Sequence, residues 1–165
     1  MLSAMIKKNE RRYRKKLRYL EDKEVWKIKV FCDIERLKRT FIKENSDIIK
    51  IDAEINVASD DRVLSLKKEK EHLIKNVLRK EIRKYEESIF MALEKLSTRK
   101  RIDMADSKEP TEQEGGIILN AVFLVAINHT LEFTDTVLEL KNRYHAVGLD
   151  IGSSGPCSPY NFNKL

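Results

Sequence analysis

The sequence predicts an α+β fold in which one antiparallel sheet is covered by helices. Three observations lead to this prediction. Residues 24–32 alternate between apolar and polar side chains, residues 117–126 are apolar at almost every position, and residues 34–96 are dominated by helical periodicity. Alternation is typical of a strand with one buried face, whereas a continuous apolar run is typical of a strand covered on both faces.

The composition favours one folded domain. The chain has 165 residues, of which 41% are apolar and 36% charged. Because the apolar residues recur periodically, this balance indicates long solvated helices and not disorder. The two cysteines form no C-x-x-C pattern and suggest a reducing compartment. No apolar run is long enough to cross a membrane, and no signal peptide is recognisable. We therefore expect a soluble cytoplasmic protein.

The chain begins with a very basic segment, residues 6–20, which has helical periodicity. Its basic side chains are opposed only by Glu10, in a chain with a formal net charge of +6. They are Lys7, Lys8, Arg11, Arg12, Arg14, Lys15, Lys16 and Arg18. A charge run of this kind is either a solvated helix face or a patch that attracts an acidic partner, nucleic acid or an acidic membrane.

A strand and two helices follow. Within residues 24–32, one side of the predicted strand carries Trp26, Ile28, Val30 and Cys32. Asp33 is placed to cap a helix over residues 34–44, and either Ser46 or Asp47 to cap a second helix ending at Val57.

A long helix is predicted over residues 62–96, because no Gly or Pro interrupts its apolar periodicity. Some 35 residues would span about 52 Å, more than the width of a compact domain of this size. The helix therefore either projects or pairs with the preceding helix as a hairpin. Its more apolar part, Tyr85 to Leu96, is expected to cover the sheet, and the charge-dense part, Lys67 to Lys84, to be solvated.

The remaining elements complete the order. We predict a strand over residues 99–105 with Ile102 and Met104 inward, a polar loop, a strand over 117–126, a helix over 130–145 ended by Gly148, and a short strand containing Leu149 and Ile151. The order is that of a ferredoxin-like β-α-β-β-α-β antiparallel sheet with an enlarged, long-helix first crossover.

The last segment, residues 155–165, is predicted to be an extended tail. Two prolines three positions apart remove amide donors and fix φ, so no regular structure is expected there. The apolar strip formed by Pro156, Pro159, Tyr160 and Phe162 would dock into a groove at low entropic cost. The alternative is that the tail folds back over its own domain.

Two segments carry a resemblance to a known family. Residues 119–125 read LNAVFLV and residues 155–162 read GPCSPYNF; upstream, Lys23, Trp26, Lys29 and Val30 fit the pattern GK-x-EW-x-x-K-V. In order and spacing, the chain from about residue 23 onward resembles gas vesicle accessory proteins of the GvpL/GvpF family. Their corresponding segments read LNAAFLV and GPWPPYSF. Cys157 and Ser158 replace an aromatic residue and a proline of that pattern, and Val25 replaces an acidic residue.

The resemblance implies a division of the chain. Members of the family carry a separate N-terminal domain before this point. Residues 1–22 are then a basic helical segment, either the last helix of such a domain or a linker from it. Residues 23–154 correspond to the α+β C-terminal domain, and residues 155–165 to the tail.

The resemblance also implies a function. It indicates a non-enzymatic assembly or minor structural protein, located with the gas vesicle, that binds the shell protein GvpA or other accessory gas vesicle proteins. The tail strip is the expected contact. Trp26 and Lys29 are either partner-binding or structural, and core packing is the favoured role of Trp26.

The residues themselves point to no reaction. His72 lies in a charged helical stretch, and His145 suits a helix C-terminus. His129 and Glu132 would be two metal ligands without a third. We find no phosphate-binding loop or nucleophile motif, and expect no catalytic residue, cofactor, metal or small-molecule substrate. The alternative function is a basic ferredoxin-like nucleic-acid-binding module, which is disfavoured because the third predicted strand offers only Phe123 for base stacking.

Overall fold

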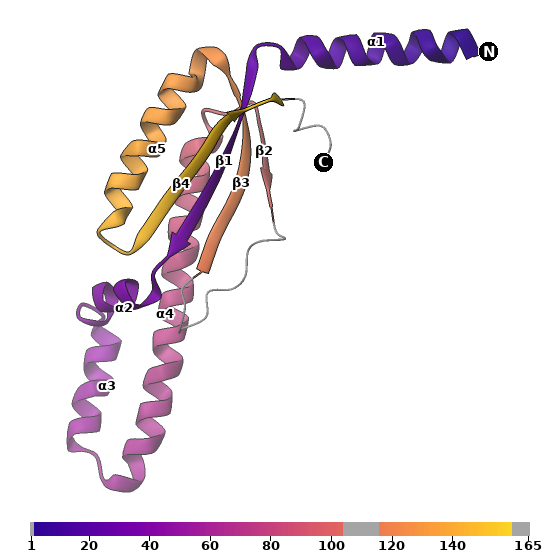
Figure 1. The fold of residues 1–165 in the computed structure, drawn as a ribbon. Helices are drawn as coiled ribbons and strands as arrows, with labels where there is room; N and C mark the ends of the chain where they lie inside the picture. The colour runs from indigo at the N-terminus through magenta and orange to yellow at the C-terminus, as the bar shows by residue number, and fades with distance from the viewer. Residues whose placement is uncertain (1, 104–115, 160–165) are drawn as a thin grey trace.

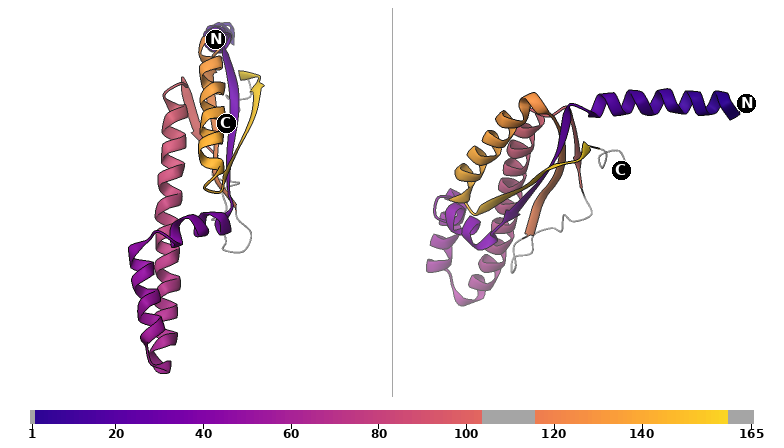
Figure 2. Two further views of the ribbon diagram at one scale, coloured as in Figure 1. Left: turned by 90° about the vertical axis from the view of Figure 1, so that its left-hand side faces the viewer. Right: turned by 45° about the horizontal axis from the view of Figure 1, so that its top comes forward.

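The structure is a computed structural model that describes residues 2–103 and 116–159. It contains a four-stranded antiparallel sheet with the strand order β2-β3-β1-β4, as Figure 1 shows. The strands are β1 (Lys23–Cys32), β2 (Arg99–Ile102), β3 (Gly116–Ala126) and β4 (Leu149–Cys157). Helices α4 (Asp60–Glu94) and α5 (Thr130–His145) lie against one face of the sheet (Figures 1 and 2). The prediction of an α+β fold is confirmed.

The two central strands follow the sequence pattern. Trp26, Ile28, Val30 and Cys32 of β1 all point into the main core, as predicted. In β3, residues 118–125 are all buried, so this strand is covered on both faces. The core lies between the sheet and the two long helices, with the rings of Phe123 and Phe133 packed at 5.7 Å.

The first three helices lie at the two ends of the sheet and not over its covered face (Figure 1). Helix α1 (Leu2–Leu20) extends from one end of the sheet, while α2 (Ile34–Ile42) and α3 (Ser46–Val57) lie at the other end (Figure 1). Asp33 caps α2 as predicted, since its carboxylate accepts a hydrogen bond of 3.2 Å from the Arg36 amide. The predicted cap of α3 is wrong: Asn45 accepts from the Asp47 and Ile48 amides, because its side chain stands just before the first turn.

Helix α4 pairs with α3 as a hairpin beyond the end of the sheet (Figure 1). Lys70 of α4 forms an ion pair with Asp52 of α3. The C-terminal part of α4 covers the sheet, as predicted, with Ile89 and Leu93 fully buried and the Phe90 ring 5.6 Å from that of Phe123. Of the two arrangements that the helix length allowed, the hairpin is observed.

Helix α5 follows the 3-10 helix η2 (Ile127–His129) and packs on the sheet through Phe133, Val137 and Leu140. Leu131, at the start of α5, does not belong to this buried stripe. Its side chain is exposed because it lies on the outer side of the first helical turn.

Strand β2 is shorter than predicted and lies at an edge of the sheet. Ile102, predicted to point inward, is 43% exposed because β3 is its only strand neighbour and the described part of the chain does not cover it. Met104 and the predicted loop that follows lie outside the described residues.

Strand β4 is longer than predicted. It runs on through Gly152–Cys157, a Gly-, Ser- and Pro-containing stretch assigned to the tail from residue 155 onward. The expectation of no regular structure after residue 154 is therefore wrong for residues 155–157. Ser154 and Cys157 of β4 pair with Lys27 and Val25 of β1, with a register shift between the two pairs. The side chains of this stretch do not indicate that pairing.

Gly148 ends the α5 turn with a φ of +102°, the left-handed conformation that the sequence predicted. A Cβ atom there would lie 3.0 Å from the Arg36 Cβ and 3.1 Å from the Asp33 oxygen. We expect Gly148→Ala to lower the free energy of unfolding by about 1–3 kcal/mol. Urea unfolding followed by circular dichroism measures this loss. An unchanged stability would contradict the strained conformation assigned to residue 148.

Candidate functional site

The end of the sheet from which α1 extends is also where β4 ends (Figure 1). Residues directly opposite each other in neighbouring strands point to the same face. By this register, one row across the face opposite the helices consists of Arg99, Leu124, Val25 and Cys157. Leu20 of α1 packs on the apolar members of this row and forms a second, smaller core with them. We call this region the tail end of the sheet.

Gly155 holds the end of β4 close to β1. Its φ is +151°, and a Cβ atom at this position would lie 2.9 Å from the Cε3 atom of Trp26 and 2.9 Å from the Val25 oxygen. Only glycine fits this approach without a shift of the neighbouring atoms. The path of the chain into the tail is therefore fixed by Gly155 against Trp26.

Tyr19 and two basic side chains join α1 to the sheet. The Lys23 Nζ atom lies 4.0 Å from the centroid of the Tyr19 ring, and the Arg99 guanidinium lies 5.4 Å from it. Cation–π contacts of this kind are worth about 0.5–1 kcal/mol each at exposed sites. They connect the base of α1 to the beginnings of β1 and β2.

The sheet face opposite α4 and α5 is basic. Lys27 and Lys29 of β1 share this face with Arg99 and Arg101 of β2, as the register places them. Phe31 follows them on the same side of β1 and is exposed. This second face therefore combines cationic side chains with the Phe31 ring, and the Tyr19 ring lies against Arg99 at the tail end.

The predicted site residues that the structure describes lie at the tail end of the sheet or on its basic face. Pro156 lies in β4 and is exposed, and Pro159 is half-buried. Tyr160 and Phe162 lie outside the described residues. Trp26 is 9% exposed, its ring lies 6.1 Å from that of Phe133, and its indole N–H has no acceptor among the described residues. Lys29 lies on the basic face, one row from Lys27.

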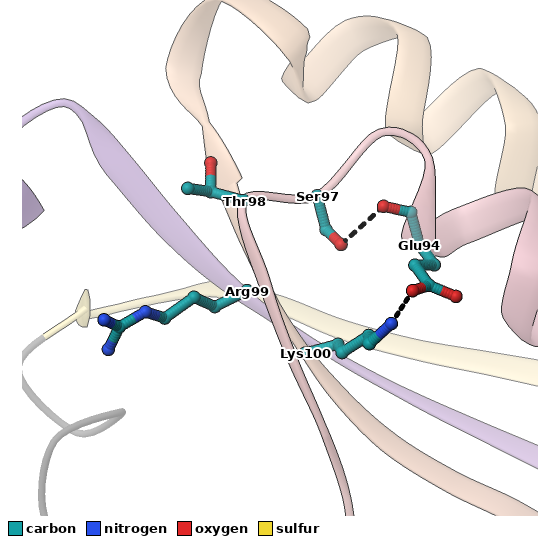
Figure 3. Close-up of a pocket in the computed structure, with 5 residues that line it drawn as sticks. All are labelled: Glu94, Ser97, Thr98, Arg99 and Lys100. Atoms are coloured by element: carbon teal, nitrogen blue, oxygen red, sulfur yellow. Dashed lines mark hydrogen bonds and ion pairs between the residues drawn. The ribbon is translucent and has the colours of Figure 1, made fainter.

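A pocket of about 400 Å³ lies between the end of α4 and the start of β2 (Figure 3). Its polar groups already interact with one another. The Ser97 hydroxyl donates to the Glu94 carbonyl at 2.9 Å, and Lys100 forms an ion pair with the Glu94 carboxylate. The Ser97 hydroxyl and the Glu94 carboxylate therefore each have a partner within the pocket.

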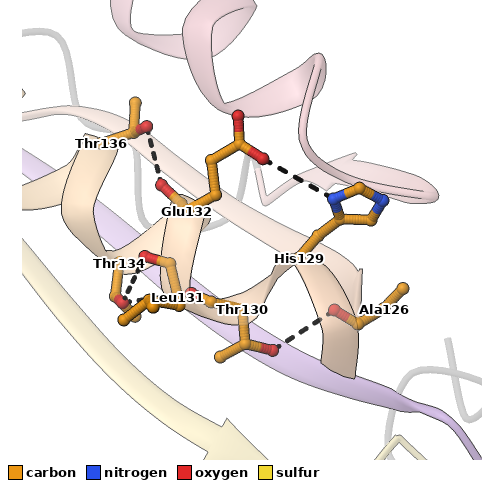
Figure 4. Close-up of polar contacts among 7 residues, drawn as sticks. All are labelled: Ala126, His129, Thr130, Leu131, Glu132, Thr134 and Thr136. Carbon is orange, nitrogen blue, oxygen red and sulfur yellow. Dashed lines mark hydrogen bonds and ion pairs between the residues drawn. The ribbon is translucent and has the colours of Figure 1, made fainter.

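The histidines make local contacts. His129 Nδ1 lies 3.7 Å from Glu132 Oε2 at the start of α5 (Figure 4), and His145 Nδ1 lies 2.9 Å from Asp150 Oδ1. In residues 2–103 and 116–159 no group of three His, Cys, Asp or Glu side chains is placed to hold a metal ion. His129, the last residue of η2, and Glu132, in the first turn of α5, therefore contact each other at the start of the helix.

The two cysteines differ in environment. Cys32 is fully buried, and burial, with the charge of Asp33 as a smaller cause, raises the pKa of its thiol to about 11. Cys157 is half-buried at the tail end. Only the Cys157 thiol is accessible to a reagent in the folded molecule.

Sequence reasoning missed Gly155 and the pair Arg99 and Arg101. A lone glycine between serine and proline gives no indication of a tryptophan 129 positions earlier in the chain. The two arginines could have been found, since their alternation with Lys100 and Ile102 places them on one face of the predicted strand.

These features define an α+β domain whose exposed parts are a basic helix, a basic sheet face and a strand that leads into an apolar tail. Such surfaces are suited to binding other macromolecules. The family model described as gas vesicle synthesis protein GvpL/GvpF matches residues 1–164, so the chain belongs to this family. None of the helices in the described part is long and apolar enough to cross a membrane.

Two solved structures are similar in fold. The crystal structure of the gas vesicle protein GvpF from Anabaena sp. PCC7120 matches with a TM-score of 0.69 and 17% identity, over 99% of this chain and 63% of that one. GvpF from Microcystis aeruginosa matches with a TM-score of 0.61 and 16% identity, over 98% of this chain and 63% of that one. The present chain thus spans less than two thirds of the length of either protein. No curated protein matches it in sequence.

Proposed function

We propose that this protein is a non-enzymatic assembly or minor structural component of gas vesicles. In this role it binds the shell protein GvpA or another accessory gas vesicle protein while the vesicle forms. Membership of the GvpL/GvpF family supports the gas vesicle role. The observation that supports the tail as the binding site is the close approach of Gly155 to Trp26. This approach sets the position from which the tail leaves the sheet.

The tail is the proposed contact with the partner. Pro156, Pro159, Tyr160 and Phe162 supply apolar surface on a segment in which proline limits the conformational freedom lost on binding. Trp26 has a supporting role in this proposal, because it is buried beneath the strand end instead of lying on the surface. Lys29 adds a positive charge on the neighbouring sheet face.

Removal of residues 159–165 tests the proposal. A cut before Gly155 would also delete the end of β4, so a loss of binding could reflect a disturbed sheet. With the later cut, co-purification with a GvpA-type shell protein is expected to fall at least tenfold while the unfolding midpoint stays constant. Such a loss corresponds to about 1.4 kcal/mol or more of binding free energy, the size of one anchoring aromatic side chain.

Point variants separate the aromatic rings from the length of the tail. Tyr160→Ser with Phe162→Ser should reproduce the loss of co-purification. Asn161→Ser with Asn163→Ser, at the alternate positions, should leave co-purification intact. If the serine-for-aromatic variant retains the shell protein as well as the unchanged chain does, the tail is not the contact.

A nucleic-acid-binding module is the second candidate. The observation that favours it is the basic sheet face formed by Lys27, Lys29, Arg99 and Arg101. The exposed rings of Phe31 and Tyr19 lie at opposite ends of β1, unlike the paired aromatics on which RNA-binding sheets stack bases. Tight RNA binding that weakens steeply with salt, without retention of shell protein, would favour this candidate over the assembly role.

We also infer that the domain is of the ferredoxin-like type, with α2, α3 and α4 as an enlarged first crossover. The strand order β2-β3-β1-β4 and the antiparallel pairing of all neighbours support this assignment.

A further inference from the structure

Helix α1 is amphipathic: a narrow apolar stripe is bordered on both sides by basic side chains. At 3.6 residues per turn, Leu2, Ile6, Tyr13, Leu17 and Leu20 fall within a sector of about 60°. The basic side chains occupy an arc of about 200° outside this sector, and Lys7, Arg11, Arg14, Lys15 and Arg18 lie within about 100° of one another. Four of these, Arg11, Arg14, Lys15 and Arg18, line one shallow surface depression.

Most of the apolar stripe of α1 is not covered by residues 2–103 or 116–159. Leu20 packs on the sheet, but the Leu2, Ile6, Tyr13 and Leu17 side chains are between 47% and 77% exposed. Figures 1 and 2 show the helix extending away from the sheet, with its N-terminal end far from the other elements. In proteins, most of the stability of a helix comes from the packing of its amphipathic face. A surface that accepts the stripe would therefore stabilise α1.

The charge of α1 limits what that surface can be. Eight Lys and Arg residues face one acid, Glu10, in a chain whose total net charge is +6. Two copies of α1 packed stripe to stripe would bring these charges together. An RNA backbone would match the charge but leave the apolar stripe in water. The surface that matches both parts of α1 has an anionic outer layer above an apolar interior.

We propose that α1 is an interfacial helix that lies on an anionic lipid bilayer. The stripe from Leu2 to Leu17 enters the boundary of the acyl chains, and the basic side contacts the headgroups. Tyr13 has the amphipathic ring favoured at this depth. The helix lies in the plane of the surface, since no described helix is apolar enough to span a membrane.

Vesicle co-sedimentation of the full chain tests the proposal. We expect binding to phosphatidylcholine vesicles that contain phosphatidylglycerol, and little binding to phosphatidylcholine alone. Binding should fall about fivefold for each basic residue of α1 that is replaced by glutamine. Each Lys or Arg near an anionic surface raises the affinity by about that factor. It should also fall as salt rises.

The apolar stripe is tested by Ile6→Ser with Leu17→Ser, which should lower vesicle binding at least tenfold for each residue removed from the acyl boundary. The matched control is Leu131→Ser with Leu138→Ser, which removes two exposed apolar side chains from α5 and should leave binding unchanged. Neither pair lies in the core, so both variants should keep the unfolding midpoint of the unchanged chain.

Three results would overturn the proposal: no binding to the anionic vesicles, equal binding by the Ile6 and Leu17 variant, or an equal loss in the α5 control. RNA binding that survives Ile6→Ser with Leu17→Ser, in the absence of vesicle binding, would instead assign α1 to a polyanion. The proposal does not rest on shell-protein binding, because the tail variants at Tyr160 and Phe162 leave α1 intact.

Discussion

Replacement of Phe123 by alanine is expected to lower the free energy of unfolding by about 3–5 kcal/mol. The Phe123 ring is fully buried in β3, between Phe90 of α4 at 5.6 Å and Phe133 of α5 at 5.7 Å. Its removal leaves a cavity where the sheet meets both covering helices, and all three elements would have to move to fill it. Urea unfolding followed by circular dichroism measures the loss.

Phe31→Ala is the matched control for this prediction. Phe31 lies in the neighbouring strand β1 but is 41% exposed on the face without helices. Its replacement should cost about 1 kcal/mol or less, as for other surface positions. Equal losses in the two variants would mean that the core is not centred on Phe123.

Gly155→Val is expected to displace the end of β4 from Trp26. The positive φ and the crowding against Trp26 and the Val25 oxygen each oppose a side chain, with a cost on the order of 1–3 kcal/mol for each effect. Because the chain cannot keep both the β4 pairing and the new side chain, the last residues of the strand should separate from β1.

Thiol labelling provides a local measurement of this displacement. Cys157 pairs with Val25 at the tail end, so its reaction with a maleimide should become faster in Gly155→Val. The Cys32 thiol is buried, with its pKa raised to about 11, and should stay unreactive until the protein unfolds. It serves as the internal reference for a folded domain.

Gly152→Val is the control for labelling. A Cβ atom at Gly152 meets only the Lys29 oxygen, at an ordinary contact distance of 3.8 Å. The Cys157 labelling rate should therefore equal that of the unchanged chain. A Gly155→Val rate no faster than that of Gly152→Val would show that Gly155 does not anchor the strand.

The sequence predicted the elements whose side chains carry the pattern of their environment. Strands β1 and β3 were recognisable because they are the central strands. Burial of one face gives β1 its alternating pattern, and burial of both faces gives β3 its continuous apolar run. The capping role of Asp33 and the left-handed Gly148 were also predictable, since each depends on the local backbone alone.

The errors occur where a distant partner determines the structure. The extension of β4 to Cys157 depends on its pairing with Val25 of β1. The small and cyclic side chains of residues 152–156 do not predict this pairing. The exposure of Ile102 depends on β2 being an edge strand, and topology decides that. The Gly155–Trp26 contact also depends on a distant partner. The existence of the tail could therefore be predicted, but not the contact that holds its start against the sheet.

Helix α4 has a mechanical consequence. It is one helix of 35 residues, about 52 Å long, which packs on the sheet with its C-terminal half and on α3 with its N-terminal half. No glycine or proline interrupts it to form a hinge. A force applied at the tip of the α3–α4 hairpin is therefore transmitted along one continuous helix to the sheet. The hairpin and the sheet cannot turn independently of each other.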